Sequence, residues 1–159
     1  MCKYIYIIHK MNKSVKIYNA SSNYSKAIKI LEKKGIRTTS QRKILTKIIF
    51  ENGNRHFTAE EIHKDVTKLN FKISLATIYN TLKHFSNNKL LKEIVVDQNK
   101  SIYCTNHEPH YHLYIEDEEK VIDIPQEKIN LLDVPQIPAC LNLHNVDIIV
   151  RVRTLKDFK

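Results

Sequence analysis

The chain of 159 residues has little of what marks fibrous, secreted or membrane proteins. Two glycines and four prolines are too few for a collagen-like or low-complexity architecture. The longest apolar runs, residues 4–8 and 148–150, are far shorter than the roughly 18 residues that a membrane span needs. The first ten residues also lack the apolar stretch of about 7 to 15 residues typical of a secretory signal. We therefore expect a soluble protein with no export signal and no membrane partner.

Cysteine is also scarce, with only Cys2, Cys104 and Cys140, and these three are far apart in the sequence. An odd number of widely spaced cysteines argues against a disulfide framework and favours a reducing compartment. We therefore expect a cytoplasmic protein. No CxxC pair occurs, so the sequence has no zinc-knuckle motif.

The charge is unevenly distributed along the chain. Residues 1–100 hold 20 of the 26 basic and 7 of the 17 acidic residues, a net charge of +13, whereas residues 101–159 carry −4. A basic first part indicates binding to a polyanion, and nucleic acid is the usual one. The alternative is a compositional bias toward lysine with no functional meaning.

Apolar spacing predicts four helices between residues 22 and 87. The first ends before Gly35, and the second is capped by Thr38 or Thr39 and stops at residues 52–53. A T-x-x-E capping box, Thr58 and Glu61, begins the third. Its apolar stripe is expected to be Ala59, Ile62, Val66 and Leu69.

The fourth helix begins at Ser74, and its polar face has the chemistry of a DNA-reading surface. If the stripe of Leu75, Ile78, Leu82 and Phe85 faces the core, the outward residues are Thr77, Asn80, Thr81 and His84, flanked by Tyr79 and Lys83. Asparagine can bond bidentately to adenine, threonine methyls and a tyrosine ring can pack on thymine methyls, and lysine can contact phosphate. An ordinary solvated helix face is the alternative. Further phosphate contacts are expected from Arg37, Arg42, Lys43, Lys92 and Lys100.

After residue 88 the apolar period shortens to two. Residues 90–96 and 100–104 flank a turn, which predicts a hairpin, and helices followed by a hairpin make a winged helix. A second module should contain strands over 111–115 and 121–124, joined by the acidic turn 116–119. A short helix over 126–132 and a strand over 144–152 would complete it, and its small sheet could pair across a dimer.

Histidines in the second module suggest a metal site. His110 and His112 are two residues apart in an expected strand, so their imidazoles should point to the same face and could bind one ion. Two merely exposed histidines are the alternative. Further candidate ligands are His56, Cys104, His107 and Asp123. Imidazoles with one carboxylate suit Fe(II), Mn(II) or Zn(II). If His56 joins ligands of the second module, metal occupancy would fix the angle between the modules and so regulate binding.

Several segments together resemble the ferric uptake regulator superfamily of bacterial metal-responsive repressors. They lie between residues 34 and 152 and are GIRTTSQRKIL, RHFTAEEIHKDV, ISLATIYNTLKHF, HYHLYIEDEEKVIDIP and VDIIVRVR. SLATIYNTL is specific, because the recognition helix of the family looks like it. Asn80, the VIDIP segment and the VDIIVRVR ending make the chain most similar to the iron response regulator branch. The resemblance implies a dimer that binds palindromic operators through a winged helix, with metal ligands at the domain hinge.

Carried over position by position, the resemblance places the regulatory metal site on His56, His110, His112 and Asp123. A fifth position, usually a carboxylate, is Cys104 here. A thiolate at that position would favour Zn(II) or haem iron and could be oxidised.

Two further implications concern zinc and haem. The CxxC pairs that hold structural zinc in the family are replaced here by Ile115 and Glu118, so we expect no structural zinc site. The iron response branch is known for sensing haem, which makes His110 and His112 candidate haem ligands, although the Cys-Pro motif of some members is absent.

The sequence thus predicts an α+β protein with an arm over residues 1–20, a winged-helix DNA-binding domain over 21–105 and a small α/β domain over 106–159 for dimerisation and metal or haem sensing. We expect a cytoplasmic homodimer that binds double-stranded operators and regulates genes of iron and haem metabolism. The alternative is a repressor of metal uptake or peroxide-stress genes that senses Fe(II), Mn(II) or Zn(II) directly. An adaptor that binds protein through the winged helix is a third class. No enzyme is expected, because Tyr114 and Ile115 stand where an H-x-H-x-D-H hydrolase site needs Asp and His.

Overall fold

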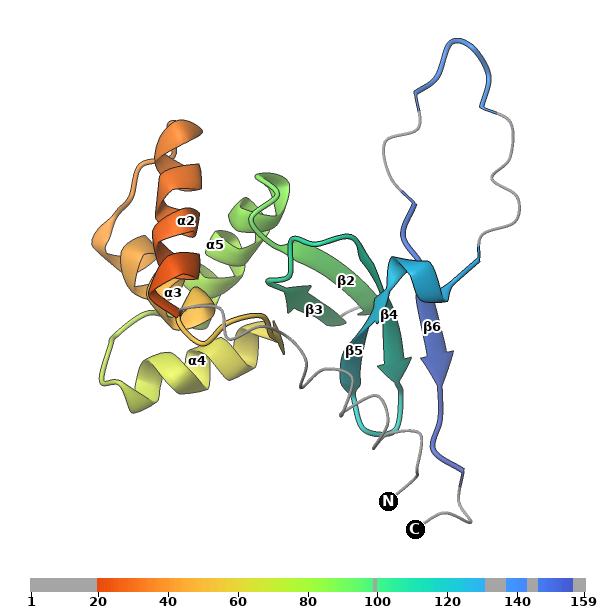
Figure 1. The fold of residues 1–159 in the computed structure, drawn as a ribbon. Coiled ribbons are helices and arrows are strands. Elements are labelled where there is room, and N and C mark those ends of the chain that lie inside the picture. Colours follow the sequence, from red (N-terminus) through yellow and green to blue (C-terminus); the bar gives the residue numbers. More distant parts are fainter. Residues whose placement is uncertain (1–19, 99, 131–136, 143–145, 156–159) are drawn as a thin grey trace. The chain divides into compact units, whose positions relative to one another are not determined.

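The computed structural model describes residues 20–98, 100–130, 137–142 and 146–155. The chain divides into two compact units, unit 1 over residues 1–107 and unit 2 over residues 108–159 (Figure 1). The predicted arm lies almost wholly outside the described residues. Among the described residues, no helix is long and apolar enough to cross a membrane.

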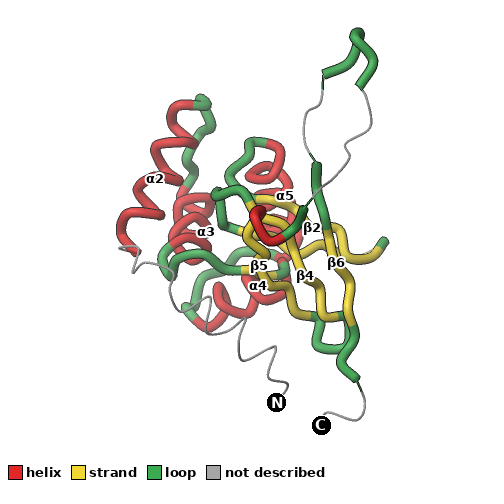
Figure 2. The backbone as a smooth tube through the Cα atoms, turned by 45° about the vertical axis from the view of Figure 1, so that its right-hand side comes forward, coloured by secondary structure: helices red, strands yellow, loops and turns green. Residues whose placement is uncertain are grey.

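The described part of unit 1 contains four helices, as the apolar spacing predicted. They are α2 (Ala20–Lys33), α3 (Ser40–Phe50), α4 (Ala59–Lys68) and α5 (Leu75–Asn87). Apart from the short 3-10 helix of unit 2, η1 (Gln126–Lys128), all helices among the described residues belong to unit 1 (Figure 2). Buried apolar side chains from all four helices form one core. Its fully buried members include Leu31, Leu45, Ile49, Ile62, Val66, Ile78, Leu82 and Phe85.

The helix ends are set by the capping residues that the sequence indicated. Thr39 accepts a hydrogen bond from the Arg42 amide at the start of α3, and Gly35 has a positive φ of 66° just after α2. Thr58 and Glu61 form the reciprocal capping box of α4. One prediction for α4 is wrong. Leu69 is 55% exposed, because the helix ends at Lys68 and Leu69 is its C-terminal cap.

A three-stranded antiparallel sheet completes unit 1. Its strands are β1 (His56–Phe57), β2 (Lys92–Asp97) and β3 (Lys100–Cys104), in the order β1-β3-β2. The predicted hairpin β2–β3 is confirmed, with Ile94 opposite Ile102 and a register shift between Val95 and Asp97. β1 was not predicted, because two residues are too few to show an alternating pattern.

Unit 2 contains a second sheet of three strands. They are β4 (His110–Ile115), β5 (Lys120–Pro125) and β6 (Ile149–Val152), in the order β5-β4-β6. β4 and β5 are antiparallel and joined by the predicted acidic turn, whereas β4 and β6 are parallel. Residues of the acidic turn hold the chain after β6, because the Arg153 Nε donates to the Glu116 carboxylate at 2.6 Å and the Thr154 amide to the Asp117 carboxylate at 2.9 Å.

Two predicted elements of unit 2 differ from the structure. Of the helix expected over residues 126–132, the described part contains the 3-10 helix η1, followed by extended backbone at Ile129, and residues 131–132 lie outside the described residues. The strand expected over 144–152 begins at Ile149, and residues 144–145 of it lie outside the described residues. Val146 and Val150 are each 36% exposed. The overall class, α+β with helices before the hairpin, is confirmed.

Candidate nucleic-acid interface and metal ligands

Helix α5 presents a polar face to solvent, because Ile78, Leu82 and Phe85 on its other face are fully buried in the core of unit 1. Tyr79, Asn80 and Lys83 are exposed and Thr77 is half-buried, on the side expected to face DNA. Thr81 was also expected there, but the prediction is wrong. Its side chain is buried and its hydroxyl donates to the Thr77 carbonyl at 2.8 Å. His84 is half-buried.

Tyr79 is tied to helix α4 by a hydrogen bond that the sequence did not reveal. Its hydroxyl donates to the carboxylate of Glu60, which lies in the first turn of α4. This bond is the main reason that the pKa of Glu60 is lowered, and the nearby charge of Lys100 lowers it further. The same bond raises the pKa of Tyr79. The pair is therefore a carboxylate and a neutral phenol at physiological pH.

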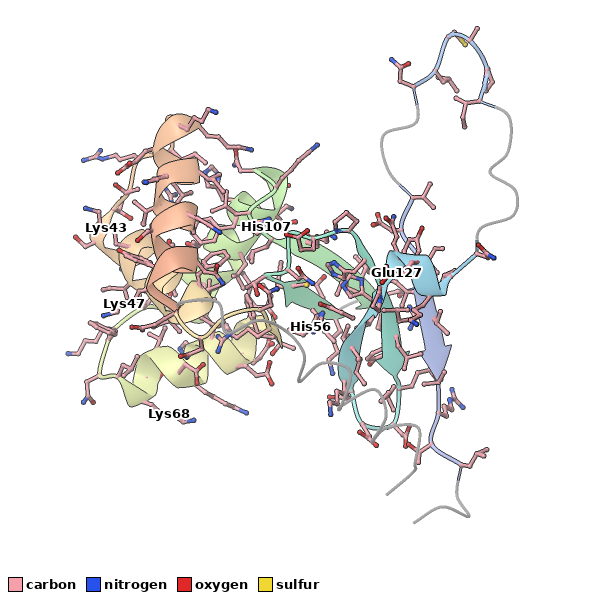
Figure 3. All side chains as sticks on the ribbon, in the orientation of Figure 1. Lys43, Lys47, His56, Lys68, His107 and Glu127 are labelled. Carbon is pink, nitrogen blue, oxygen red and sulfur yellow. The ribbon has the colours of Figure 1, made fainter. Side chains whose placement is uncertain are left out.

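The basic side chains of unit 1 lie in two settings. The Arg42 guanidinium donates to the Arg37 carbonyl, which fixes Arg42 against the loop before α3. Lys43, Lys47 and Lys68 project from the helices toward solvent (Figure 3). On the hairpin, Lys92 and Lys100 are half-buried. The described part of unit 1 thus offers several cations for phosphate contacts, one of them held by a hydrogen bond and others exposed to solvent.

Two of the predicted metal ligands form a pair in unit 1. His56 and Cys104 are directly opposite in the antiparallel register of β1 and β3, so both side chains lie on the same face of the sheet. The other neighbour of β3 is β2, in which Lys92 is opposite Cys104. The Cys104 side chain is 1% exposed, and its sulfur accepts a hydrogen bond from the Asn106 amide at 3.3 Å.

The other three predicted ligands form a triad in unit 2. His110 and His112 come from β4 and Asp123 from β5, where it is opposite His112. The Nε2 atoms of the two imidazoles are 2.9 Å apart. One carboxylate oxygen of Asp123 lies 3.5 Å from the His110 Nε2 and 3.8 Å from the His112 Nε2. The predicted common face of the two histidines is therefore confirmed.

The 2.9 Å distance between the two imidazole nitrogens suits two neighbouring ligands of one metal ion. Ligands about 2.0–2.1 Å from an ion are separated by about 2.9 Å at neighbouring octahedral positions and about 3.3 Å at tetrahedral ones. The His110 Nδ1 lies 2.6 Å from the Glu108 carbonyl, which can only accept, so Nδ1 carries the proton and Nε2 offers its lone pair. The imidazoles are 8% and 7% exposed, and buried groups of this kind are commonly paired or bound to metal.

Each unit thus carries its own part of the predicted ligand set, a nitrogen and sulfur pair in unit 1 and two nitrogens with one carboxylate in unit 2. His107, the further candidate from the sequence, is exposed (Figure 3). Glu60 is the residue that sequence reasoning missed. It lies 19 positions from Tyr79 on another helix, so no local spacing connects the two.

Comparison with known proteins gives a consistent result. The model of the ferric uptake regulator family matches residues 33–149 of this chain. The peroxide-responsive repressor PerR of Staphylococcus aureus (strain Mu50 / ATCC 700699) is 30% identical over 120 residues, which are 76% of this chain and 80% of that protein.

Among solved structures, the ferric uptake regulator of Vibrio cholerae has a TM-score of 0.62 at 22% identity and covers 79% of this chain and 98% of its own. The ferric uptake regulator of Pseudomonas aeruginosa with manganese has a TM-score of 0.60 at 20% identity, with 79% and 96% covered. At these identities the likeness shows the fold alone, a winged-helix unit followed by a smaller unit built on a sheet.

Proposed function

Because the chain belongs to the ferric uptake regulator family, whose members are metal-responsive transcription regulators, we propose that it binds operator DNA in response to iron and haem status and controls genes of iron and haem metabolism. The observation that carries the proposal is the triad of His110, His112 and Asp123, whose two imidazoles are buried and whose donor atoms lie 2.9 to 3.8 Å apart. Such a cluster in a domain separate from the DNA-reading helix is what a ligand-responsive regulator needs.

Operator recognition is assigned to unit 1. The exposed face of α5 would enter the major groove, with Asn80 bonding to a base, and with Thr77 and Tyr79 contacting base methyl groups. Lys83, Arg42 and Lys100 would bind phosphates. What supports this is the basic charge of residues 1–100 and the exposure of the outward α5 side chains.

We propose that His56 and Cys104 join the triad as ligands of one divalent ion. Nitrogen, carboxylate and thiolate donors together suit Fe(II), Mn(II) or Zn(II), and the thiolate favours the softer ions. An ion that takes ligands from both units would restrict their relative orientation. DNA binding and ion binding would then strengthen each other by the same factor.

Haem is the second ligand that we propose. One imidazole of His110 or His112 could supply a nitrogen ligand to haem iron, and Cys104 could supply a thiolate. A repressor of metal uptake or peroxide-stress genes that senses its ion directly is the alternative, and the similarity to a peroxide-responsive repressor favours it.

The active form is proposed to be a cytoplasmic homodimer on a palindromic operator, with unit 2 as the dimerisation domain. Family membership supports the dimer. In a dimer, three cations per protomer would make six phosphate contacts. The logarithm of the binding constant should then fall with the logarithm of salt concentration with a slope of about −5.

The test uses purified protein and duplexes selected from a random library, with binding measured by fluorescence anisotropy. The metal-free protein is compared with samples given Fe(II), Mn(II), Zn(II) or haem, each at 50 to 200 mM salt. We expect affinity to change with at least one ligand and to drop about 10³-fold across this salt range. If the affinity for the duplex changes with an added ion but not with haem, the haem proposal is wrong. Affinity that ignores both ligand and salt would contradict the function as a whole.

A further inference from the structure

The hydrogen bond between Tyr79 and Glu60 has a consequence for base reading that goes beyond the proposed function and rests on it. We propose that Glu60 is a positioning residue for operator recognition. Its carboxylate takes the hydroxyl hydrogen of Tyr79 and holds the ring, so that Tyr79 recognises thymine through the ring and not through the hydroxyl.

The geometry makes Glu60 a fixed support. Glu60 is the second residue of α4, next to the reciprocal capping box of Thr58 and Glu61 that anchors the first turn of this helix. Tyr79 is the fifth residue of α5, two residues after the first-turn amide that Ser74 caps. The bond therefore joins two helix ends that are each held by a cap, and it restrains a ring that is 42% exposed.

The chemistry of the bond limits what the hydroxyl can do on DNA. A phenol has one hydrogen to donate, and its bond to a carboxylate is stronger than a neutral hydrogen bond. Phosphate oxygens, thymine O4 and adenine N7 are all acceptors, so none can receive this hydrogen while Glu60 holds it. The hydroxyl oxygen can still accept a hydrogen bond, but thymine has no donor in the major groove. The contact left for thymine is therefore between the exposed part of the ring and the 5-methyl group.

The lowered pKa of Glu60 agrees with this assignment, because it keeps the acceptor ionised under physiological conditions. A purely structural role is the competing explanation, since an acidic side chain in the first turn also stabilises a helix through its dipole. The two roles differ in what happens at individual thymines. Loss of helix stability weakens all complexes equally, whereas loss of ring positioning removes only the dependence on thymine methyl groups.

The experiment replaces each thymine of the selected duplex with uracil, one position at a time, which removes only the methyl group. For the metal-loaded wild-type protein we expect a loss of about fourfold in affinity at one thymine per half-site, the factor that corresponds to burying one methyl group. In Glu60→Ala this factor should fall to about one. In Glu60→Gln it should remain, because the amide oxygen still accepts the hydroxyl hydrogen.

Tyr79→Phe has no hydroxyl for Glu60 to hold, so it should lose the dependence on the methyl group as Glu60→Ala does. The double variant Glu60→Ala/Tyr79→Phe should show no greater loss of this dependence than either single variant. Glu51→Gln is the matched control. It removes one exposed carboxylate of unit 1, which is paired only weakly with Lys47 at 3.9 Å, and should leave the methyl factor intact. Circular dichroism and thermal melts confirm that each variant is folded.

The outcomes separate this inference from the function on which it rests. If Tyr79→Ala abolishes the methyl factor but Glu60→Ala keeps it at the wild-type value, the positioning role is wrong and operator reading by Tyr79 stands. If Glu60→Gln loses the factor together with Glu60→Ala, the hydrogen bond is not what holds the ring. If no thymine shows a methyl factor, or no duplex is bound, operator reading by Tyr79 fails and the positioning role fails with it.

Discussion

Replacing Asn80 with alanine tests whether helix α5 recognises bases by hydrogen bonding. Asn80 is the sixth residue of α5 and is exposed on the face opposite the buried Ile78 and Leu82. Alanine has the higher helix propensity, so the substitution should not destabilise unit 1. A bidentate contact between asparagine and adenine discriminates against other bases by about 1–3 kcal/mol, which is a factor of about 5 to 150 in affinity.

The assay is anisotropy titration of the protein with a set of duplexes in which each operator position is changed in turn. The wild-type protein should strongly prefer one adenine per half-site. In Asn80→Ala the preference for that adenine should fall by a factor of about 5 to 150, while the base preferences at all other operator positions stay unchanged. Asn87→Ala at the last residue of α5 is the control and should keep the wild-type preferences. If Asn80→Ala binds every duplex in the wild-type order of affinity, Asn80 contacts no base and the assigned orientation of α5 is wrong.

Two further predictions concern unit 1 itself. Thr58→Ala removes the capping box of α4 and should lower the free energy of unfolding by about 1 kcal/mol in urea titrations, with Thr58→Ser restoring it; an unchanged midpoint would contradict the role of the cap. Burial, with a smaller effect from the charge of Glu93, raises the pKa of Tyr103 to about 12 from 10.0. The contribution of Tyr103 to stability is complete below pH 10 and is lost as the pH rises toward 12, so unfolding at pH 8 and pH 11.5 should differ less in Tyr103→Phe than in the wild type.

Local patterns in the sequence predicted much of unit 1, because its determinants are local. Apolar residues at helical spacing, the capping box at Thr58, the cap at Ser74 and the turn between β2 and β3 all lie within a few residues of the structure that they specify. The shared face of His110 and His112 follows in the same way from the alternation of side chains along a strand.

The features that the sequence did not reveal depend on partners distant in the chain. The two-residue strand β1 exists because Phe57 and His56 pair with β3, nearly 50 positions away. Tyr79 finds Glu60 on another helix for the same reason. Thr81 lies on a polar stretch of α5 but is buried, since its hydroxyl is satisfied by the helix carbonyl of Thr77 and its methyl group can join the interior.

The most direct test of the central claim is the ligand response of operator binding in the double variant His110→Ala/His112→Ala. The claim is that the triad of His110, His112 and Asp123 binds Fe(II) or haem and that this binding sets the affinity of unit 1 for DNA. Operator affinity is measured with and without Fe(II) and with and without haem. The account predicts a clear change for the wild-type protein and none for the variant, whose ligand-free affinity should match that of the ligand-free wild type. A variant that responds to Fe(II) and haem as the wild type does would contradict it.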